Sequence, residues 1–185
     1  VAFYRPSQGY KFMMVTFGGM TGVLSGMNTE GLTITLNAAK SEIPTSSAMP
    51  VSILAREILQ YASTIDEAYA IAAKRKMFVA ESFLVGSAKE NKAAIIERTP
   101  DKIALVAPAG DQIISTNHFL SNDLGNTELN KTHMQTSASL YRYKRVEELL
   151  ARQKKNSISH TLSILRDKMG LQDKNIGLGN EKSII

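Results

Sequence analysis

Two asparagines and one arginine are the side chains of this sequence best suited to stabilising negative charge. Asn37 and Asn117 each follow an expected strand, and Arg142 lies on the first turn of an expected helix. Amide and guanidinium groups donate hydrogen bonds, so these side chains could stabilise an oxyanion or hold a carboxylate, but none is a nucleophile. Spacing alone favours plainer interpretations, in which Asn37 caps its strand and Arg142 is a solvated charge on a helix face.

The other residue types that commonly carry chemistry form no recognisable motif. His118, His133 and His160 lack the spacing of metal ligands, and each is better explained as a surface or hydrogen-bonded residue. No nucleophile elbow, dinucleotide loop or P-loop occurs in the sequence. The 185 residues contain no cysteine, which excludes disulfides, thiolate metal sites and a cysteine nucleophile within them. We therefore expect no metal and no cofactor.

Length and composition indicate a single domain over residues 1–185. The chain is 43% hydrophobic and 21% charged, which is ordinary for a globular domain, and no linker or repeat divides it. No apolar run approaches the roughly 18 to 20 residues of a membrane helix. Residues 1–92 carry 9 basic against 7 acidic side chains, and residues 93–185 carry 13 against 10. Because the positive charge is spread so evenly, we expect no nucleic-acid partner.

Strand and helix patterns position the candidate side chains. Leu32, Ile34 and Leu36 alternate with threonines, which predicts a strand that Asn37 ends. Pro50 suits the first turn of a helix, and Thr64-Ile65-Asp66-Glu67 is a capping box that begins a second helix. The other expected strands cover residues 12–17, 23–24, 82–85, 93–97, 103–106 and 112–116, and Asn117 follows the last of them.

The remaining segments complete the predicted architecture. Residues 38–49 and 121–136 are polar and predict loops. A helix beginning at Ser137 or Ser139 carries Arg142, and a final helix is expected over residues 159–168. Two blocks of strands with helices between and after them predict an α+β fold in which antiparallel sheets pack face to face.

Six segments in a fixed order carry a family resemblance over roughly residues 12 to 168. They are Gly26-Met27-Asn28-x-x-Gly31-Leu32 running to Leu36-Asn37, the helix pair with 56–59 and 64–68, and then 82–85, 94–100, 115–119 and 139–145. In this order they resemble choloylglycine hydrolases, penicillin V acylases and acyl-CoA:6-aminopenicillanate acyltransferases, which are N-terminal-nucleophile (Ntn) hydrolases. The Thr-Asn-His-Phe and Ser-x-x-Arg-Tyr forms favour the acyltransferase branch.

The resemblance implies an αββα sandwich and the cleavage or transfer of a non-peptide amide. In this family an N-terminal Cys attacks the carbonyl, and its own α-amine is the base. Asn37 and Asn117 fall on the positions that form the oxyanion hole, the first through its backbone and the second through its side-chain amide. Arg142 falls on the arginine that sits beside the nucleophile, and His118 matches the motif without a catalytic role.

The sequence departs from the family at the nucleophile. The expected Cys and a nearby Asp are absent upstream of Phe12, and the first residue is Val1 instead of an initiator Met. We therefore expect a piece of an Ntn-type amide hydrolase or acyltransferase whose Cys lies upstream, making the αββα sandwich incomplete and this segment alone inactive. Its partner would be a small N-acyl amide or acyl donor. A non-catalytic Ntn-fold binding module is the alternative, and a basic protein that binds an anionic polymer is a weaker one. Homo-oligomerisation is open, and the compartment is not predicted.

Overall fold

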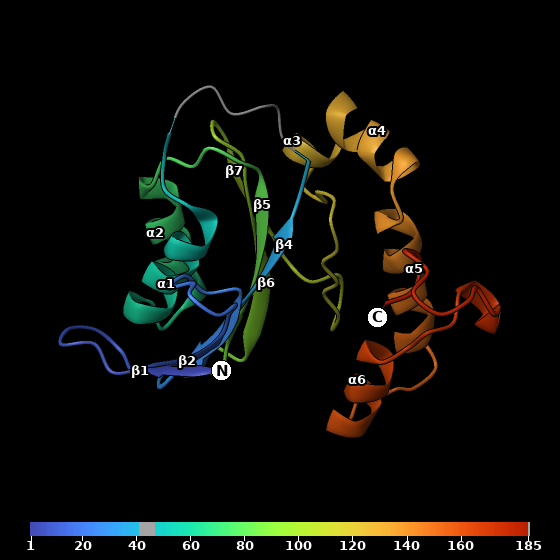
Figure 1. Cartoon of the computed structure of the whole chain (residues 1–185), viewed down its shortest axis with the longest axis horizontal. Helices are drawn as coiled ribbons and strands as arrows, with labels where there is room; N and C mark the ends of the chain where they lie inside the picture. The colour runs from blue at the N-terminus through green and yellow to red at the C-terminus, as the bar shows by residue number, and fades with distance from the viewer. Residues whose placement is uncertain (41–46, 185) are drawn as a thin grey trace.

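Seven strands form one antiparallel sheet in which each strand pairs with its neighbours in the sequence (Figure 1). A computed structural model describes residues 1–40 and 47–184. Part of the loop expected at 38–49 therefore lies outside the described residues. The strands are β1 (Ala2–Tyr4), β2 (Phe12–Val15), β3 (Ser25–Asn28), β4 (Leu32–Ala38), β5 (Glu81–Ser87), β6 (Lys92–Arg98) and β7 (Ile103–Val106).

Two of the expected strands are wrong. The prediction at 23–24 fails because Val23 is fully buried and its N–H donates to the carbonyl of Ser52, in a helix, at 2.9 Å. The sheet strand β3 begins only at Ser25. Residues 112–116 are not a strand either. In the segment that follows them, much of the main-chain hydrogen bonding is to side chains. The other five expected strands are present within a few residues of their predicted bounds.

The two blocks of strands form one sheet and not two within the described residues. The chain returns from the helices and pairs β5 along the whole of β4, from Leu32 opposite Ser87 to Ala38 opposite Glu81. This pairing joins the two blocks edge to edge. The α+β class with an antiparallel sheet is confirmed, whereas the second sheet of the expected sandwich is not formed by the described part of the chain.

One face of the sheet is covered by α1 (Val51–Tyr61) and α2 (Ile65–Lys74). The capping box of α2 is confirmed at Thr64, whose hydroxyl accepts the N–H of Glu67 at 3.2 Å. The Glu67 carboxylate accepts the N–H of Ser63 at 2.7 Å, and this bond lowers the pKa of Glu67. The core between this helix pair and the sheet includes Phe12, Met14, Leu32, Ile34, Leu54, Ile58, Leu59, Ala68, Phe83, Val85 and Ile96.

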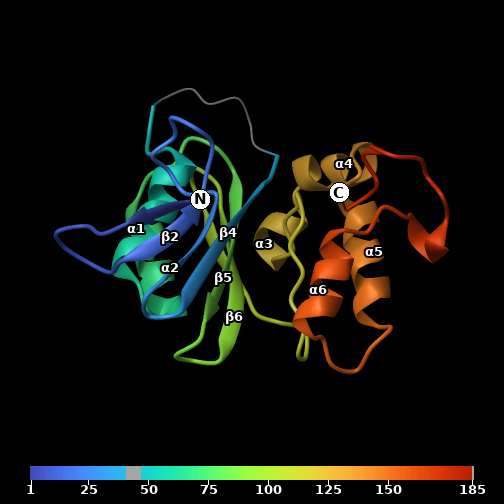
Figure 2. The same cartoon turned by 60° about the horizontal axis from the view of Figure 1, so that its bottom comes forward.

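A second group of helices lies beyond the opposite face, and residues 107–121 run between it and the sheet (Figure 2). It comprises α3 (Asn122–Gly125), α4 (Glu128–Thr136), α5 (Ser139–Leu150), α6 (Ile158–Leu165) and the short 3₁₀ turn η1 (Leu171–Asp173). The helix expected from Ser139 is confirmed, and the final helix ends earlier than expected. Over the described residues, none of the helices combines the length and apolar character needed to cross a bilayer.

The loop expected at 121–136 is wrong, because its polar residues are helix caps. The Ser121 hydroxyl accepts the N–H of Leu124, which begins α3. The Thr127 hydroxyl accepts the N–H of Asn130, which begins α4. Serine and threonine favour loops and helix N-caps alike, so this composition does not distinguish the two structures.

Candidate functional site

Asn37 lies at the end of β4 on the sheet face that α1 and α2 leave uncovered. Its neighbour Leu36 packs toward the helix pair, and successive side chains of a strand point to opposite faces. The Asn37 side chain donates from Nδ2 to the hydroxyl of Ser115 at 3.1 Å, and the residue is half-buried. This bond joins the end of β4 to the segment that leads into Asn117.

Asn117 is held at both ends of its side-chain amide. Its Nδ2 donates to the carbonyl of Ala38 at 2.9 Å, and its Oδ1 accepts from Nη2 of Arg142 at 2.9 Å. A guanidinium only donates and a carbonyl only accepts, so these two contacts fix which end of the amide is nitrogen. The Asn117 side chain therefore has a defined orientation.

The three residues predicted from the sequence come together in the structure. Asn37 and Ala38 end β4, Asn117 bonds to Ala38, and Arg142 on the first turn of α5 bonds to Asn117. Asn37 and Asn117 lie 80 positions apart in the chain. The plain interpretation of Arg142 as a solvated charge is not supported, because the guanidinium contacts a defined partner and its buried Nε has no acceptor among the described residues.

The Asn117 side chain has an N–H group that no described residue accepts. A primary amide carries two N–H groups, and the Ala38 carbonyl takes one of those on Asn117. The main-chain N–H of Asn37 is less available. Leu36 donates to Leu24 on one side of β4 and Ala39 donates to Ala80 on the other, and N–H groups alternate between the sides of a strand. The N–H of Asn37 is thus directed toward β5. The geometry supports the Asn117 side chain as an oxyanion donor more directly than the Asn37 backbone, whose role stays a prediction.

Buried side chains hold the segment that carries Asn117. Asn130, on α4, accepts the N–H of Phe119 at 2.9 Å and donates to its carbonyl at 3.1 Å. The carboxylate of Glu97, on β6, accepts the N–H groups of Leu120 and Ser121. Glu97 has no exposed surface. These side chains satisfy backbone groups that a strand would pair with a neighbouring strand.

Ser139, Glu97 and Asn130 contribute to this site, although the sequence reasoning gave them no such role. Ser139 is fully buried at the start of α5, and its hydroxyl accepts the main-chain N–H of Asn117 at 2.8 Å. Its position one helical turn before Arg142 is the signal that could have identified it. Glu97 and Asn130 gave no comparable signal, since their partners are backbone groups that the sequence does not mark.

The histidines do not form a metal site. His118 is buried, and burial lowers its pKa, with a smaller contribution from the charge of His133. His160 contacts Asn156 through Nδ1 on an exposed part of α6. Among the described residues, no group of three or more His, Asp or Glu side chains has the arrangement of a metal site.

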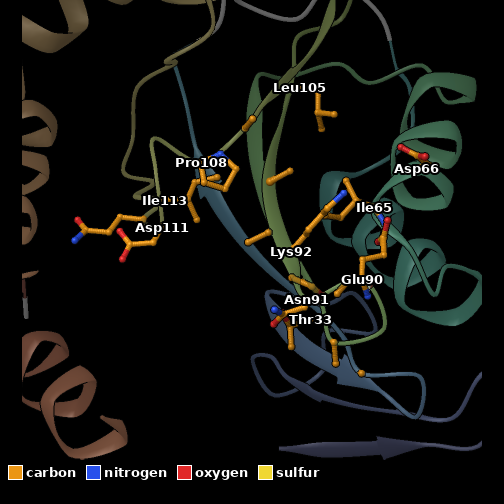
Figure 3. Close-up of a pocket in the computed structure, with 18 of the residues that line it drawn as sticks. Thr33, Ile65, Asp66, Glu90, Asn91, Lys92, Leu105, Pro108, Asp111 and Ile113 are labelled. Atoms are coloured by element: carbon orange, nitrogen blue, oxygen red, sulfur yellow. Dashed lines mark hydrogen bonds between the residues drawn. The ribbon is translucent and has the colours of Figure 1, made fainter. Parts of the chain in front are cut away.

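An open groove of about 1080 Å³ lies on the same sheet face as Asn37, toward the other end of β4. Its floor includes Thr33, Gly86 and Ala93, which are aligned across β4, β5 and β6. Figure 3 shows Pro108, Asp111 and Ile113 on one side of the groove, and Ile65 and Glu90 on the other. Ile113, which lines the groove, lies two residues before Ser115, the hydrogen-bond partner of Asn37.

Solved structures with the same arrangement of elements show the class of fold. An N-acylethanolamine-hydrolyzing acid amidase (NAAA) ortholog from Caenorhabditis elegans matches with a TM-score of 0.60 and 18% identity, over 99% of this chain and 75% of that one. Penicillin V acylase from Agrobacterium tumefaciens matches with a TM-score of 0.58 and 19% identity, over 85% of this chain and 55% of that one. The fold is that of the Ntn hydrolases.

The chain belongs to the acyl-coenzyme A:6-aminopenicillanic acid acyl-transferase family, whose model matches residues 1–181. An uncharacterized protein of Archaeoglobus fulgidus is 30% identical over 104 residues, which cover 54% of this chain and 17% of that protein. The chain therefore spans only a small part of this relative and about half of the penicillin V acylase. Membership of this family confirms the resemblance seen in the six sequence segments.

Proposed function

We propose that these residues form the oxyanion-stabilising part of an Ntn-type amide hydrolase or acyltransferase that acts on N-acyl substrates. The observation that carries the proposal is the Asn117 amide, which Ala38 and Arg142 orient from opposite ends. No acceptor among the described residues takes its second N–H, which leaves this group for a ligand. The family and the fold support the general kind of reaction.

The chemistry requires a nucleophile, and the chain contains no cysteine. We place the nucleophilic Cys upstream, outside residues 1–185. Its thiol loses a proton to the α-amine of the same residue, and the sulfur bonds to the substrate carbonyl carbon. Negative charge then develops on the carbonyl oxygen, which accepts from the Asn117 side chain. The C–N bond breaks as the amine leaves with a proton. Water or another amine then attacks the thioester and releases the sulfur.

Arg142 has two roles in this proposal. It fixes the Asn117 amide, and its positive charge favours the thiolate of a nearby cysteine. The names of the relatives suggest the substrates to assay first, which are penicillin V and an N-acylethanolamine.

The test begins with the intact mass and N-terminal sequence of the full-length gene product, followed by assays of both substrates. Asn117→Ala should lower kcat by on the order of 10²–10³ while the free energy of unfolding changes little. Asn122→Ala is the control, because Asn122 is exposed on α3. Equal losses of activity and stability in Asn117→Ala would contradict the oxyanion role. A mature protein without a Cys that binds these amides unchanged would support the non-catalytic binding module.

A further inference from the structure

The first turn of α5 contacts Asn117 at two points. Ser139 accepts the main-chain N–H of Asn117 at 2.8 Å, and Arg142 donates to the side-chain Oδ1 at 2.9 Å. The two α5 residues are three positions apart, so they lie on the same face of the helix. One rigid element thus sets both the backbone position and the amide orientation of Asn117.

The hydroxyl of Ser139 is saturated with hydrogen bonds. It donates to Thr116 Oγ1 at 3.1 Å, and it lies 2.8 Å from Nδ1 of His118. A serine hydroxyl has one proton and two lone pairs. The proton goes to Thr116 and one lone pair to the N–H of Asn117, so the other lone pair is left to accept from Nδ1 of His118, which also lies 3.1 Å from Thr116 Oγ1. This arrangement of donors favours the His118 tautomer that carries its proton on Nδ1.

A pair of serine and histidine at 2.8 Å also resembles a nucleophile with its base, and the geometry argues against that function. A general base must accept the serine proton, whereas the Ser139 hydroxyl donates its proton to Thr116 Oγ1. Ser139 has no exposed surface, and His118 is 3% exposed. A substrate carbonyl could not reach the Ser139 hydroxyl without moving α5 away from residues 116–118.

We infer that Ser139 is a positioning residue, fixed by His118 and Thr116, that holds Asn117 at the distance needed to donate to the oxyanion. This inference rests on the proposed function, because Asn117 must donate to substrate for its position to affect turnover. Ser139 acts through Asn117 and does not touch substrate. Loss of its hydroxyl leaves the main-chain N–H of Asn117 without its acceptor and releases residues 116–118 from α5.

The experiment compares Ser139→Ala with Ser87→Ala and Asn117→Ala in the full-length gene product, with the N-acyl amide that the wild type turns over fastest. Ser87 is a matched control. It is a buried serine that donates to the carbonyl of Ser63 at 3.2 Å and accepts from Glu90, at the opposite end of β5 from the site. Ser139→Ala should lower kcat by on the order of 10²-fold and leave KM near its wild-type value. Ser87→Ala should lower stability without this loss of kcat.

Two further measurements do not depend on how well Ser139→Ala folds. The imidazole ¹⁵N shifts of the wild-type protein should show the Nδ1–H tautomer for His118, assigned by the signal that disappears in His118→Gln. A fluorophosphonate should not label Ser139. Labelling at Ser139, or a proton on Nε2 of His118 with Nδ1 bare, would overturn the inference.

The kinetic outcomes separate this inference from the proposed function. Full kcat in Ser139→Ala together with a large loss in Asn117→Ala would reject positioning by Ser139 and leave the proposed function standing. Full kcat in Asn117→Ala would reject both. Equal losses in Ser139→Ala and Ser87→Ala would show an effect of stability alone and would also reject positioning.

Discussion

Arg142 donates to Asn117 across a gap of 25 residues in the chain, and this bond together with the one from Asn117 to Ala38 fixes the orientation of the Asn117 amide. Without Arg142 only the bond to the Ala38 carbonyl would hold the amide. The effects of changing the two residues should therefore be coupled.

We predict that Arg142→Ala slows acylation or maturation, and that Asn117→Ala adds little once Arg142 is gone. The measurement is a double-mutant cycle of kcat/KM for the two residues, in which a coupling of roughly 0.5–3 kcal/mol is typical of contacting groups. Arg142→Lys should not restore activity, because an ammonium lacks the planar fork of the guanidinium. Lys144→Ala, an exposed change on the same helix, is the control. Strict additivity of the two losses would contradict the pairing.

Glu97→Gln should loosen the segment that carries Asn117. The carboxylate accepts two main-chain N–H groups, whereas a glutamine presents one oxygen and an NH₂ group that must face a second donor. We expect a loss of about 1–3 kcal/mol in the free energy of unfolding, measured with urea. Hydrogen exchange should also become faster in residues 119–121. Glu30→Gln, at an exposed turn, should change neither quantity. Unchanged exchange in Glu97→Gln would show that other contacts hold the segment.

Glu81 should make stability depend on pH. Burial raises the pKa of Glu81 from its ordinary 4.5 to about 7. Between these values the unfolded chain loses the proton while the folded chain keeps it, so the contribution of Glu81 to stability falls as pH rises through this window. His118, whose pKa burial lowers from 6.5, contributes in the opposite direction. The full effect amounts to about 3 kcal/mol at most. The carboxylates whose pKa is lowered, such as Glu67 and Glu148, change stability below pH 4.5 and stay outside the window.

The measurement for Glu81 is urea unfolding at pH 5 and pH 8. Glu81→Gln should remove the fall in stability that Glu81 causes between the two pH values and be more stable than the wild type at pH 8. Glu30→Gln should keep the wild-type difference. If Glu81→Gln retained the wild-type slope, another group would be responsible for it.

Arg145 should anchor the C-terminal segment to α5. The Arg145 side chain is 1% exposed. Its guanidinium contacts Asp167 at 2.8 Å, Asp173 at 2.9 Å and Glu148 at 3.1 Å. Arg145→Met removes the cation and leaves three carboxylates close together. The three carboxylates are 13–56% exposed and stay partly solvated, so the cost should lie below the roughly 3–5 kcal/mol typical of a fully buried pair. Limited proteolysis should cut residues 166–174 faster in this variant than in the wild type or in Lys144→Ala. Equal cleavage rates would mean that the segment is held elsewhere.

The sequence identified most of the sheet because local patterns specify it. Alternating side chains marked β4, and short apolar runs between turns marked β5 to β7. The capping box at Thr64 gave the start of α2, because its bonds form within one helical turn. The errors at 112–116 and 121–136 have a different origin. The segment that follows residues 112–116 is held by side chains from distant parts of the chain, such as Glu97. Residues 121–136 contain helix caps, whose residue types also suit loops.

By itself the sequence determined the family, the α+β class and the candidates Asn37, Asn117 and Arg142, because these depend on residue types in a fixed order. Only the tertiary structure decided that the strands join in one sheet and that Asn117 lies between Ala38 and Arg142. It also brought in Ser139, Glu97 and Asn130. Their partners are main-chain groups, which every residue carries, so no pattern of side chains along the chain can reveal which of them will meet.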